Sequence, residues 1–489
     1  MTLERDIAGV IDETADPIGV DEIRGRAQSP GAGGGDRRGP APLLVAAAVV
    51  AAVVAAIGVF AWWPSGNDTS VVAGLPDTTT DPASFAGAEW EQIGSIEGEL
   101  ASAPGAEERT GGIGALTINR LRELPSGLYA VGTEQARDGG FVARVWRAGN
   151  DETWDRLGGE AFGDDRGSSR TAMAGIAERD GTVVAAGQLG GPTGAPQQTE
   201  PTAWWSDDAG ATWHAVTLPL SADAESSAEA GANVAGIAAG PDGFVVVGFV
   251  SDGRFVRPAA WRSDNGVEWE VAPFGTSTDR VDVIDIEVMD DRYVVVGTTG
   301  AYQPGSAAMA WTSTDGGHSW TPSDLDDIAS TSGTSGITSV AAGPDGLLAV
   351  GYRQAGDATS VPGSEATASE PGLDVDHVLW FSPDGLTWVE RAPLDLPGPG
   401  ITMVAAGAGG FLLTSLTSTD DGQVVIDQLT TDGTDRQVVE SPPGGASMAT
   451  TGTVDGFVAA VQEMGPSAGG TTDVRERLTT RQVWRLEPS

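Results

Sequence analysis

The sequence predicts an all-β fold, a seven-bladed β-propeller, preceded by one transmembrane helix and a short cytoplasmic tail. Three features predict it: a tryptophan-bounded segment that recurs along the chain, an apolar run before each copy, and one long uncharged stretch near the N-terminus. The predicted organisation is a largely disordered cytoplasmic tail at 1–41, a signal-anchor helix at 42–63, an extracellular linker at 64–85 and the propeller at 86–489.

The membrane helix is predicted from an uncharged run that ends at Trp62 and Trp63. A helix over 43–63 would be about 31 Å long, close to the ~30 Å of a bilayer's hydrocarbon core. A cleaved signal peptide is the alternative, but its apolar region is usually about 7–15 residues and its leader short. Because Arg37 and Arg38 precede the run and the next Arg is Arg109, the positive-inside rule places the N-terminus in the cytoplasm and the C-terminal domain outside the cell.

The charge balance excludes several classes of function. Lys and Arg total 27, Asp and Glu total 69, and the net charge is −42. Because phosphate backbones require a basic face, a nucleic-acid partner is not expected. With no cysteine there are no disulfides, thiolate nucleophiles or cysteine-based metal sites. No dinucleotide or phosphate-binding motif stands out, so we expect no cofactor and no metal.

The repeat is clearest in the tryptophans. Five segments each hold two tryptophans, eight or nine positions apart: 146/154, 205/213, 261/269, 311/320 and 380/388. Before each segment lies an apolar run, at 127–132, 182–187, 244–248, 293–297 and 347–351, and further runs lie at 411–415 and 457–461. Repeats of about 40–50 residues with four short strands are typical of propeller blades.

Each unit is predicted to consist of strands a, b, c and d joined by tight turns and longer loops. Such a sheet cannot bury both faces alone, so neighbouring units must stack. The last unit supplies only strands a, b and c before the chain ends near Trp484. The segment around Trp90 resembles a d strand, so we expect Trp90 to close the ring against the Trp484 strand.

Within the segments, the pattern Ser-x-Asp-x-Gly-x-Thr-Trp resembles the Asp-box, also called the bacterial neuraminidase repeat. That repeat occurs in sialidases, in sortilin-type receptors and in non-enzymatic propellers, so the resemblance implies a propeller and leaves the activity open. The residues matched to it are Asp151, Trp154, Ser206, Asp208, Gly210, Trp213, Ser263, Asp264, Gly266, Trp269, Ser313, Asp315, Gly317, Trp320, Ser382, Asp384, Gly385 and Trp388.

The boxes are expected to be structural. An Asp in a tight turn accepts hydrogen bonds from turn N–H groups, Gly permits positive φ, and Trp can cover the seam between blades. Calcium ligation is the alternative for the aspartates, but calcium requires about 6–8 oxygens. Carbohydrate stacking is the alternative for the tryptophans.

The boxes are expected in the c–d turns, which share one face of the propeller with the a–b turns. Function is expected on the other face, where the b–c and d–a loops emerge from the rigid scaffold. A sialidase-like site there would need three arginines for a substrate carboxylate, a tyrosine nucleophile paired with a glutamate, and an acid. The weak candidates are Arg137, Arg254, Arg353 and Tyr352, with Arg170, Arg280, Tyr302, Glu200 and Asp357 also considered. Convergence of these residues would indicate an enzyme, whereas dispersed arginines paired with acids would indicate a binding module.

The sequence therefore predicts a single-pass, membrane-anchored extracellular propeller that recognises or organises an unknown protein or glycan of the cell envelope. The alternative is a sialidase-like exo-glycosidase acting on the same loop face.

Overall fold

The computed structural model describes the strands of the C-terminal part of the chain and the tight turns between them. The described residues are 85, 87–98, 116–135, 141–149, 153–162, 171–190, 199–220, 231–251, 256–272, 274, 281–299, 306–325, 333–355, 375–391, 402–415, 425–429, 436–439, 442–443, 445–463 and 480–488. All of them belong to one compact unit, Ile57–Ser489.

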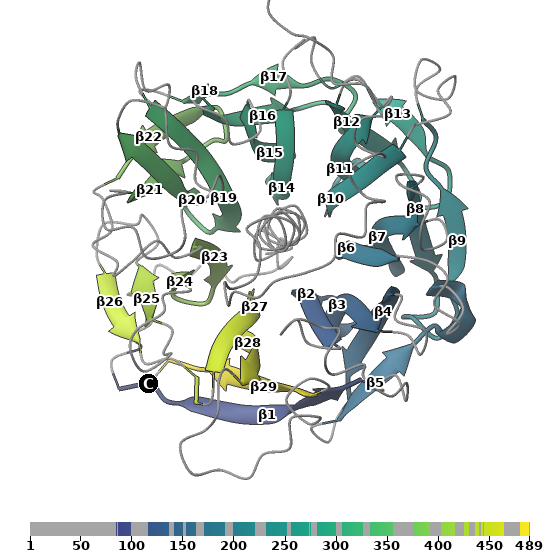
Figure 1. Cartoon of the computed structure of the whole chain (residues 1–489), viewed down its shortest axis with the longest axis horizontal. Coiled ribbons are helices and arrows are strands. Elements are labelled where there is room, and N and C mark those ends of the chain that lie inside the picture. Colours follow the sequence, from purple (N-terminus) through teal and green to yellow (C-terminus); the bar gives the residue numbers. More distant parts are fainter. Residues whose placement is uncertain are drawn as a thin grey trace, which may run out of the picture. The chain divides into compact units, whose positions relative to one another are not determined.

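The described strands form seven sheets arranged around a common axis (Figure 1). We number the sheets as blades 1 to 7 in chain order. Blade 1 consists of β2(Leu116–Leu124), β3(Gly127–Gln135), β4(Phe141–Ala148) and β5(Trp154–Leu157). Blade 2 consists of β6(Ala172–Arg179), β7(Thr182–Gly190), β8(Thr199–Ser206) and β9(His214–Thr217). Blade 3 consists of β10(Gly231–Gly240), β11(Gly243–Ser251), β12(Val256–Ser263) and β13(Glu270–Ala272).

The remaining blades follow the same order, and blade 5 has one additional strand, β18(Asp324–Leu325), at its outer edge. Blade 4 consists of β14(Val281–Met289), β15(Arg292–Thr299), β16(Ala308–Ser313) and β17(Thr321–Pro322), and blade 5 of β18, β19(Gly333–Gly343), β20(Gly346–Ala355), β21(Val375–Ser382) and β22(Thr387–Glu390). Blade 6 consists of β23(Thr402–Gly407), β24(Gly410–Ser415), β25(Val425–Leu429) and β26(Arg436–Val439). Blade 7 consists of β27(Gly445–Thr453), β28(Gly456–Glu463), β29(Thr480–Leu486) and β1(Trp90–Glu97). The all-β propeller predicted from the repeat is confirmed.

The ring is closed by strands from the two ends of the described region. The first strand of each blade packs against the first strands of both neighbouring blades, and the cycle returns from β27 to β2. The fourth strand of blade 7 is β1, which pairs antiparallel with β29, so Trp90 is opposite Leu486 and Gln92 is opposite Trp484. The predicted closure of Trp90 against the Trp484 strand is confirmed.

Blade 5 has a fifth strand that the repeat did not predict. The short strand β18 leaves blade 4 and pairs in parallel with β22, so Asp324 is opposite Thr387 and Leu325 is opposite Trp388. The outer strands of the other sheets have no such partner among the described strands.

The glycine that ends five of the apolar runs has a geometric cause. In those five blades the inner strand contains a β-bulge. The glycine of the second strand is paired with the last residue of the inner strand before that bulge. A Cβ added to Gly248 would lie 1.9 Å from the carbonyl oxygen of Asn233, and one added to Gly132 would lie 2.0 Å from that of Thr117. At these distances only glycine fits, although the bulge alone does not require it, because Val461 faces the residue before the bulge of blade 7.

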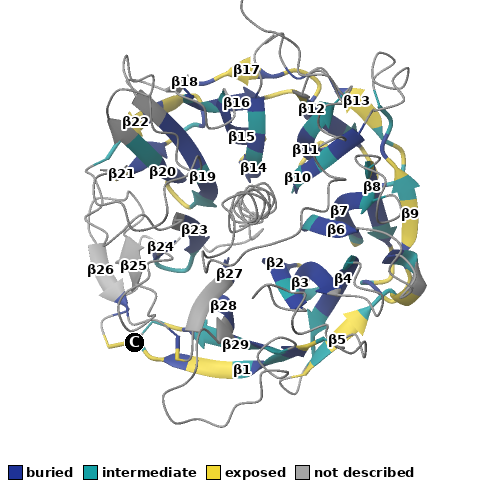
Figure 2. Cartoon of the chain, in the orientation of Figure 1, coloured by how far each residue is buried: buried dark blue, intermediate teal, exposed yellow. Residues whose placement is uncertain are grey.

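The hydrophobic core consists of layers between neighbouring blades. Inner and middle strands are buried, whereas outer strands carry most of the exposed positions (Figure 2). In the layer between blades 1 and 2, Tyr129 and Val131 pack with Val183 and Trp204. The alternating pattern of the apolar runs therefore buries one set of side chains against each neighbour.

One residue of the predicted linker packs against the propeller. Phe85, placed in the linker by the sequence analysis, is buried and its ring lies 5.5 Å from that of Phe457 in blade 7. The predicted tail at 1–41 and helix at 42–63 lie outside the described residues, as does nearly all of the linker. Within the described part of the chain, no helix is long and apolar enough to cross a membrane.

Candidate functional site

The strand order fixes what lies at each end of the propeller. Because neighbouring strands of a blade are antiparallel, the described a–b and c–d turns lie at one end of the propeller, which we call the box face. The b–c and d–a ends of the strands lie at the other end, the loop face. Side-chain contacts agree: Arg179 of blade 2 donates to the carbonyl oxygens of both Pro241 in the a–b turn and Asp264 in the c–d turn of blade 3. Most of the loop-face connections lie outside the described residues.

The box turns are organised by a serine hydroxyl and a carboxylate two residues later. In blade 2, the N–H of Gly210 donates to Ser206 Oγ at 2.8 Å, and Ser206 Oγ donates to Asp208 Oδ1 at 2.8 Å. The N–H and hydroxyl of Thr212 donate to the two oxygens of Asp208 at 2.8 and 2.7 Å. Ser313, Asp315, Gly317 and Ser319 repeat this arrangement in blade 4.

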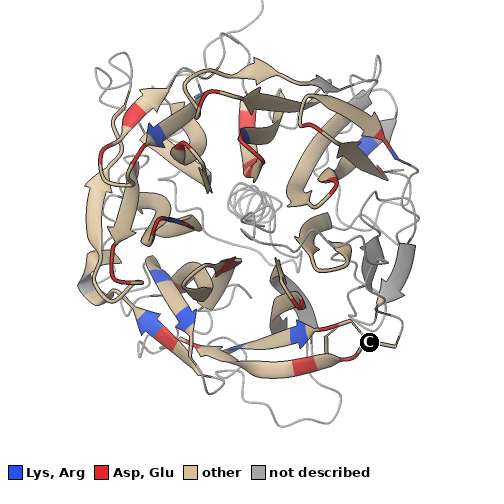
Figure 3. Cartoon of the chain, turned by 180° about the vertical axis from the view of Figure 1, so that it is seen from behind, with Lys and Arg blue, Asp and Glu red and all other residues tan. Residues whose placement is uncertain are grey.

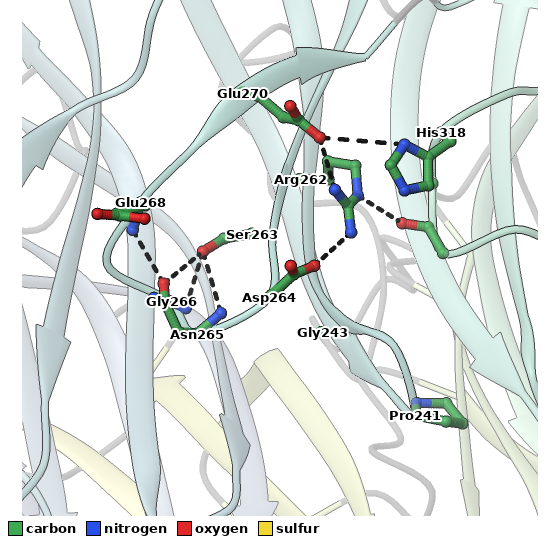
Figure 4. Close-up of polar contacts among 12 residues, drawn as sticks. Pro241, Gly243, Arg262, Ser263, Asp264, Asn265, Gly266, Glu268, Glu270 and His318 are labelled. Atoms are coloured by element: carbon green, nitrogen blue, oxygen red, sulfur yellow. Dashed lines mark hydrogen bonds and ion pairs between the residues drawn. The ribbon is translucent and has the colours of Figure 1, made fainter.

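The structure corrects the box of blade 3. The acid assigned from the sequence was Asp264, but the side chain that accepts from the turn is that of Asn265 (Figure 4). Asn265 Oδ1 accepts from the N–H groups of Val267 and Glu268 at 2.9 and 3.0 Å. Asp264 instead forms an ion pair with Arg262. The position two residues after the serine is the structural one, and an amide oxygen serves there as well as a carboxylate.

These hydrogen bonds change the acidity of the turn carboxylates. The N–H of Thr212, together with the Thr212 and Ser206 hydroxyls, lowers the pKa of Asp208 to about 2. Burial raises the pKa of Asp315 and of Asp384, but hydrogen bonds from Ser319 and Ser313 at the first, and from Thr387, Leu386 and Ser382 at the second, outweigh it and lower the pKa of both. Hydrogen bonds donated to the charged form keep these three turn carboxylates ionised.

Three of the box tryptophans, Trp213, Trp320 and Trp388, pack in the seams between blades. Trp213 is buried, and its ring lies 5.3 Å from that of Phe162, which a 3-10 turn after blade 1 supplies. Trp320 and Trp388 are also buried, and the ring of Trp320 lies 5.1 Å from Phe274. Trp154 and Trp269 are half-buried beside their seams.

Side chains of one blade hold the box turn of the next. Arg262 Nε donates to the carbonyl oxygen of Gly316 at 3.3 Å, and Arg292 Nη1 donates to that of Asp384 at 2.8 Å. The hydroxyl of Tyr129 donates to the carbonyl oxygen of Ala209 at 3.0 Å. These cross-blade contacts were not predicted, because a single arginine in a strand carries no sequence signal of its partner.

The sequence-predicted catalytic candidates do not converge among the described residues. Tyr352 and Arg353 are consecutive in β20, so their side chains leave opposite faces of the sheet. Arg353 donates to both oxygens of Glu390, at 3.2 and 2.6 Å. An added Cβ on Gly336 would lie 2.9 Å from the Tyr352 hydroxyl.

The other candidates lie outside the described residues or in another blade. Arg137, Arg254, Arg170, Arg280, Tyr302 and Asp357 lie outside the described residues, as does the box residue Asp151. Glu200 is exposed in β8 of blade 2.

Figure 3 shows the arginines of the described strands spread over several blades of the ring. Several of them form ion pairs with acids, among them Arg144, Arg262 and Arg353. Near the loop face of blade 1, Glu134 Oε2 accepts from Arg144 at 2.7 Å and from Arg156 at 3.3 Å. Within the described part of the chain, no group of three or more His, Asp or Glu side chains could hold a metal ion.

Comparison of the sequence with family models and with curated proteins gives no match. Solved structures of similar architecture include the α-L-arabinofuranosidase of Fusarium graminearum with arabinobiose, at 14% identity and a TM-score of 0.40, covering 63% of this chain and 90% of that one. The sialidase of Trypanosoma rangeli with sialic acid has 12% identity and a TM-score of 0.42, covering 68% of this chain and 57% of that one. The α-L-arabinanase of Penicillium chrysogenum with arabinobiose has 10% identity and a TM-score of 0.38, covering 77% of this chain and 97% of that one. This chain thus accounts for little more than half the length of the trypanosomal sialidase.

Proposed function

We propose that this propeller is a recognition or scaffold module of the cell envelope, held at the membrane by residues 42–63 and binding a protein or glycan on its loop face. The observation that carries the proposal is the pairing of Arg353 with an acid of its own blade. Arg353, the one catalytic arginine candidate among the described residues, is engaged bidentately by Glu390. A carboxylate-binding arginine must present that same planar fork to its ligand.

We also propose that the turns at Ser206, Ser263, Ser313 and Ser382 are Asp-boxes with a structural role. Their acceptor oxygens are used by N–H and hydroxyl groups of the same turn, as at Asp208 and Thr212. This leaves the loop face as the surface that varies from blade to blade and can carry specificity.

A sialidase-like exo-glycosidase is the second candidate, and it is favoured by Tyr352. This half-buried tyrosine lies at the loop-face end of β20. A Cβ added to Gly336 would lie 2.9 Å from the Tyr352 hydroxyl and 3.0 Å from Thr298 Oγ1, so hydroxyls of blades 4 and 5 approach one another there. A tyrosine nucleophile is the known exception among glycosidases.

Hydrolysis separates the two candidates. The full-length chain is incubated with fluorogenic sialosides, arabinofuranosides and a panel of other glycosides, beside the Tyr352→Phe variant and the Arg353→Met variant. We expect no turnover by any of the three proteins. Turnover by the wild-type chain that is lost in Tyr352→Phe, with unfolding unchanged, would replace the recognition proposal by the glycosidase.

A further inference from the structure

Two charged side chains from opposite blades meet across the axis of the propeller. Arg120 lies in β2 of blade 1 and Asp285 lies in β14 of blade 4, strands that face each other across the centre in Figure 1. Arg120 Nη2 lies 2.9 Å from Asp285 Oδ1, and both side chains are buried. The other contacts described so far join strands within a blade or neighbouring blades, so this pair is of a different kind.

The two residues occupy the same position of the repeat. Each is the residue at which strand pairing resumes after the β-bulge of its first strand, where Arg120 is opposite Val131 and Asp285 is opposite Val296. In blades 2 and 3, which lie between them along the ring, the equivalent residues are Gly175 and Gly236.

Glycine at the intervening position leaves room for the pair. A Cβ added to Gly236 would lie 3.2 Å from Ile286 Cγ2 and 3.8 Å from Asp285 Oδ1. A larger side chain on blade 3 would therefore compete with Arg120 for the space beside the carboxylate. One ring of equivalent positions thus combines a cation, two glycines and an anion in chain order.

Both partners also bind the backbone of the next blade along. Arg120 Nε donates to the carbonyl oxygen of Ala174 in β6 at 3.2 Å. Asp285 Oδ1 accepts from its own neighbour Ile286 at 3.0 Å, and Asp285 Oδ2 accepts from the N–H of Val340 in β19 at 3.4 Å. The pair and its hydrogen bonds therefore connect blades 1, 2, 4 and 5.

We infer that Arg120 and Asp285 form an axial brace that couples opposite blades and fixes the diameter of the ring. Stacked blades contact only their neighbours, so small rotations at each seam can add up to a change of ring shape. A bond across the axis opposes that change. It holds the loop faces of opposite blades in one arrangement and lowers the ordering cost of binding there.

Hydrogen exchange of the full-length chain, resolved by strand, tests the brace. In Arg120→Met we expect faster exchange in β14 and β19, on the far side of the axis, as well as in β2 and β6. The matched control is Arg144→Met, which breaks the buried pair with Glu134 inside blade 1. It should speed exchange only in blade 1. Faster exchange confined to β2 and β6 in Arg120→Met would overturn the inference.

A double-variant cycle covers the case in which one substitution simply unfolds the protein. Removing one partner of a buried pair is strongly destabilising because the other charge stays buried, so Arg120→Met and Asp285→Leu should each lower the Tm by about 4–8 °C. The combined variant should recover most of that loss, since replacement of both partners by apolar groups is often neutral. Additive losses in the combined variant would show that the two residues act independently, and would overturn the brace.

Discussion

Substitution of Gly248 by alanine tests the explanation of the glycine that ends the apolar runs. The added Cβ would lie 1.9 Å from the carbonyl oxygen of Asn233, which is more than 1 Å inside the ~3 Å that packed atoms tolerate. Alanine favours a strand over glycine by roughly 0.5–1 kcal/mol through chain entropy alone. The contact opposes this with roughly 3 kcal/mol or more, the upper range for overpacked interiors. The net expectation is a loss of about 2 kcal/mol or more.

Gly297 provides the graded comparison, because its added Cβ would lie 2.5 Å from the carbonyl oxygen of Asp282. The shift that Gly297→Ala demands is about half as large, so its loss should be about 1 kcal/mol. Guanidinium unfolding of the full-length chain, followed by tryptophan fluorescence, measures both. A neutral or stabilising Gly248→Ala, or a larger loss in Gly297→Ala, would refute the bulge explanation.

Four further substitutions test the turns and the closure. Asn265→Ala should lower stability by about 1 kcal/mol, the usual cost of a lost turn or cap acceptor, whereas Asp264→Asn should have little effect; chemical denaturation of both compares them. The pKa of Asp208 is lowered from 3.8 to about 2, so its contribution to stability is present above pH 3.8 and is lost as the pH falls from there towards 2. Asp208→Asn keeps the acceptor oxygen but does not titrate. Its Tm should therefore fall less steeply with decreasing pH over that interval than the Tm of the wild-type chain. Trp90 is buried in the closing blade, so Trp90→Ala should lower the free energy of unfolding by about 3–5 kcal/mol. The variant should release β1 first, which hydrogen exchange would detect as faster exchange in β1 and β29. Unchanged protection of these two strands would count against closure by β1.

The parts of the fold that repeat were predictable from the sequence. The tryptophan pairs, the apolar runs and the turn residues recur in the same order in successive units, so each blade supported the assignment of the others. The closing strand was predictable as well, because the segment around Trp90 resembles a fourth strand and the last unit lacks one. The strand β18 was not predictable, since two residues with parallel pairing leave no periodic pattern.

Single residues at one position were harder to assign. The sequence favoured Asp264 over Asn265 because a carboxylate fits the box pattern. In the structure the turn acceptor is the residue two positions after Ser263, which is Asn265. Arg120 and Asp285 are 165 residues apart, and only the ring geometry brings them together. Arg353 carried the residue type that a carboxylate site requires, but its partner Glu390 comes from the far strand of the same blade.

The most direct test of the account is to ask which face of the propeller meets its partner. A photo-crosslinking residue is placed at Glu200 or Asp376, which are exposed near the loop face, and at Asp242 or Asp345, which are exposed in box-face turns. The full-length variants are illuminated in the native envelope. If the loop face binds the partner, a discrete adduct forms from the loop-face positions and none forms from the box-face positions. An adduct formed from the box face alone, or equally from both faces, would contradict binding at the loop face.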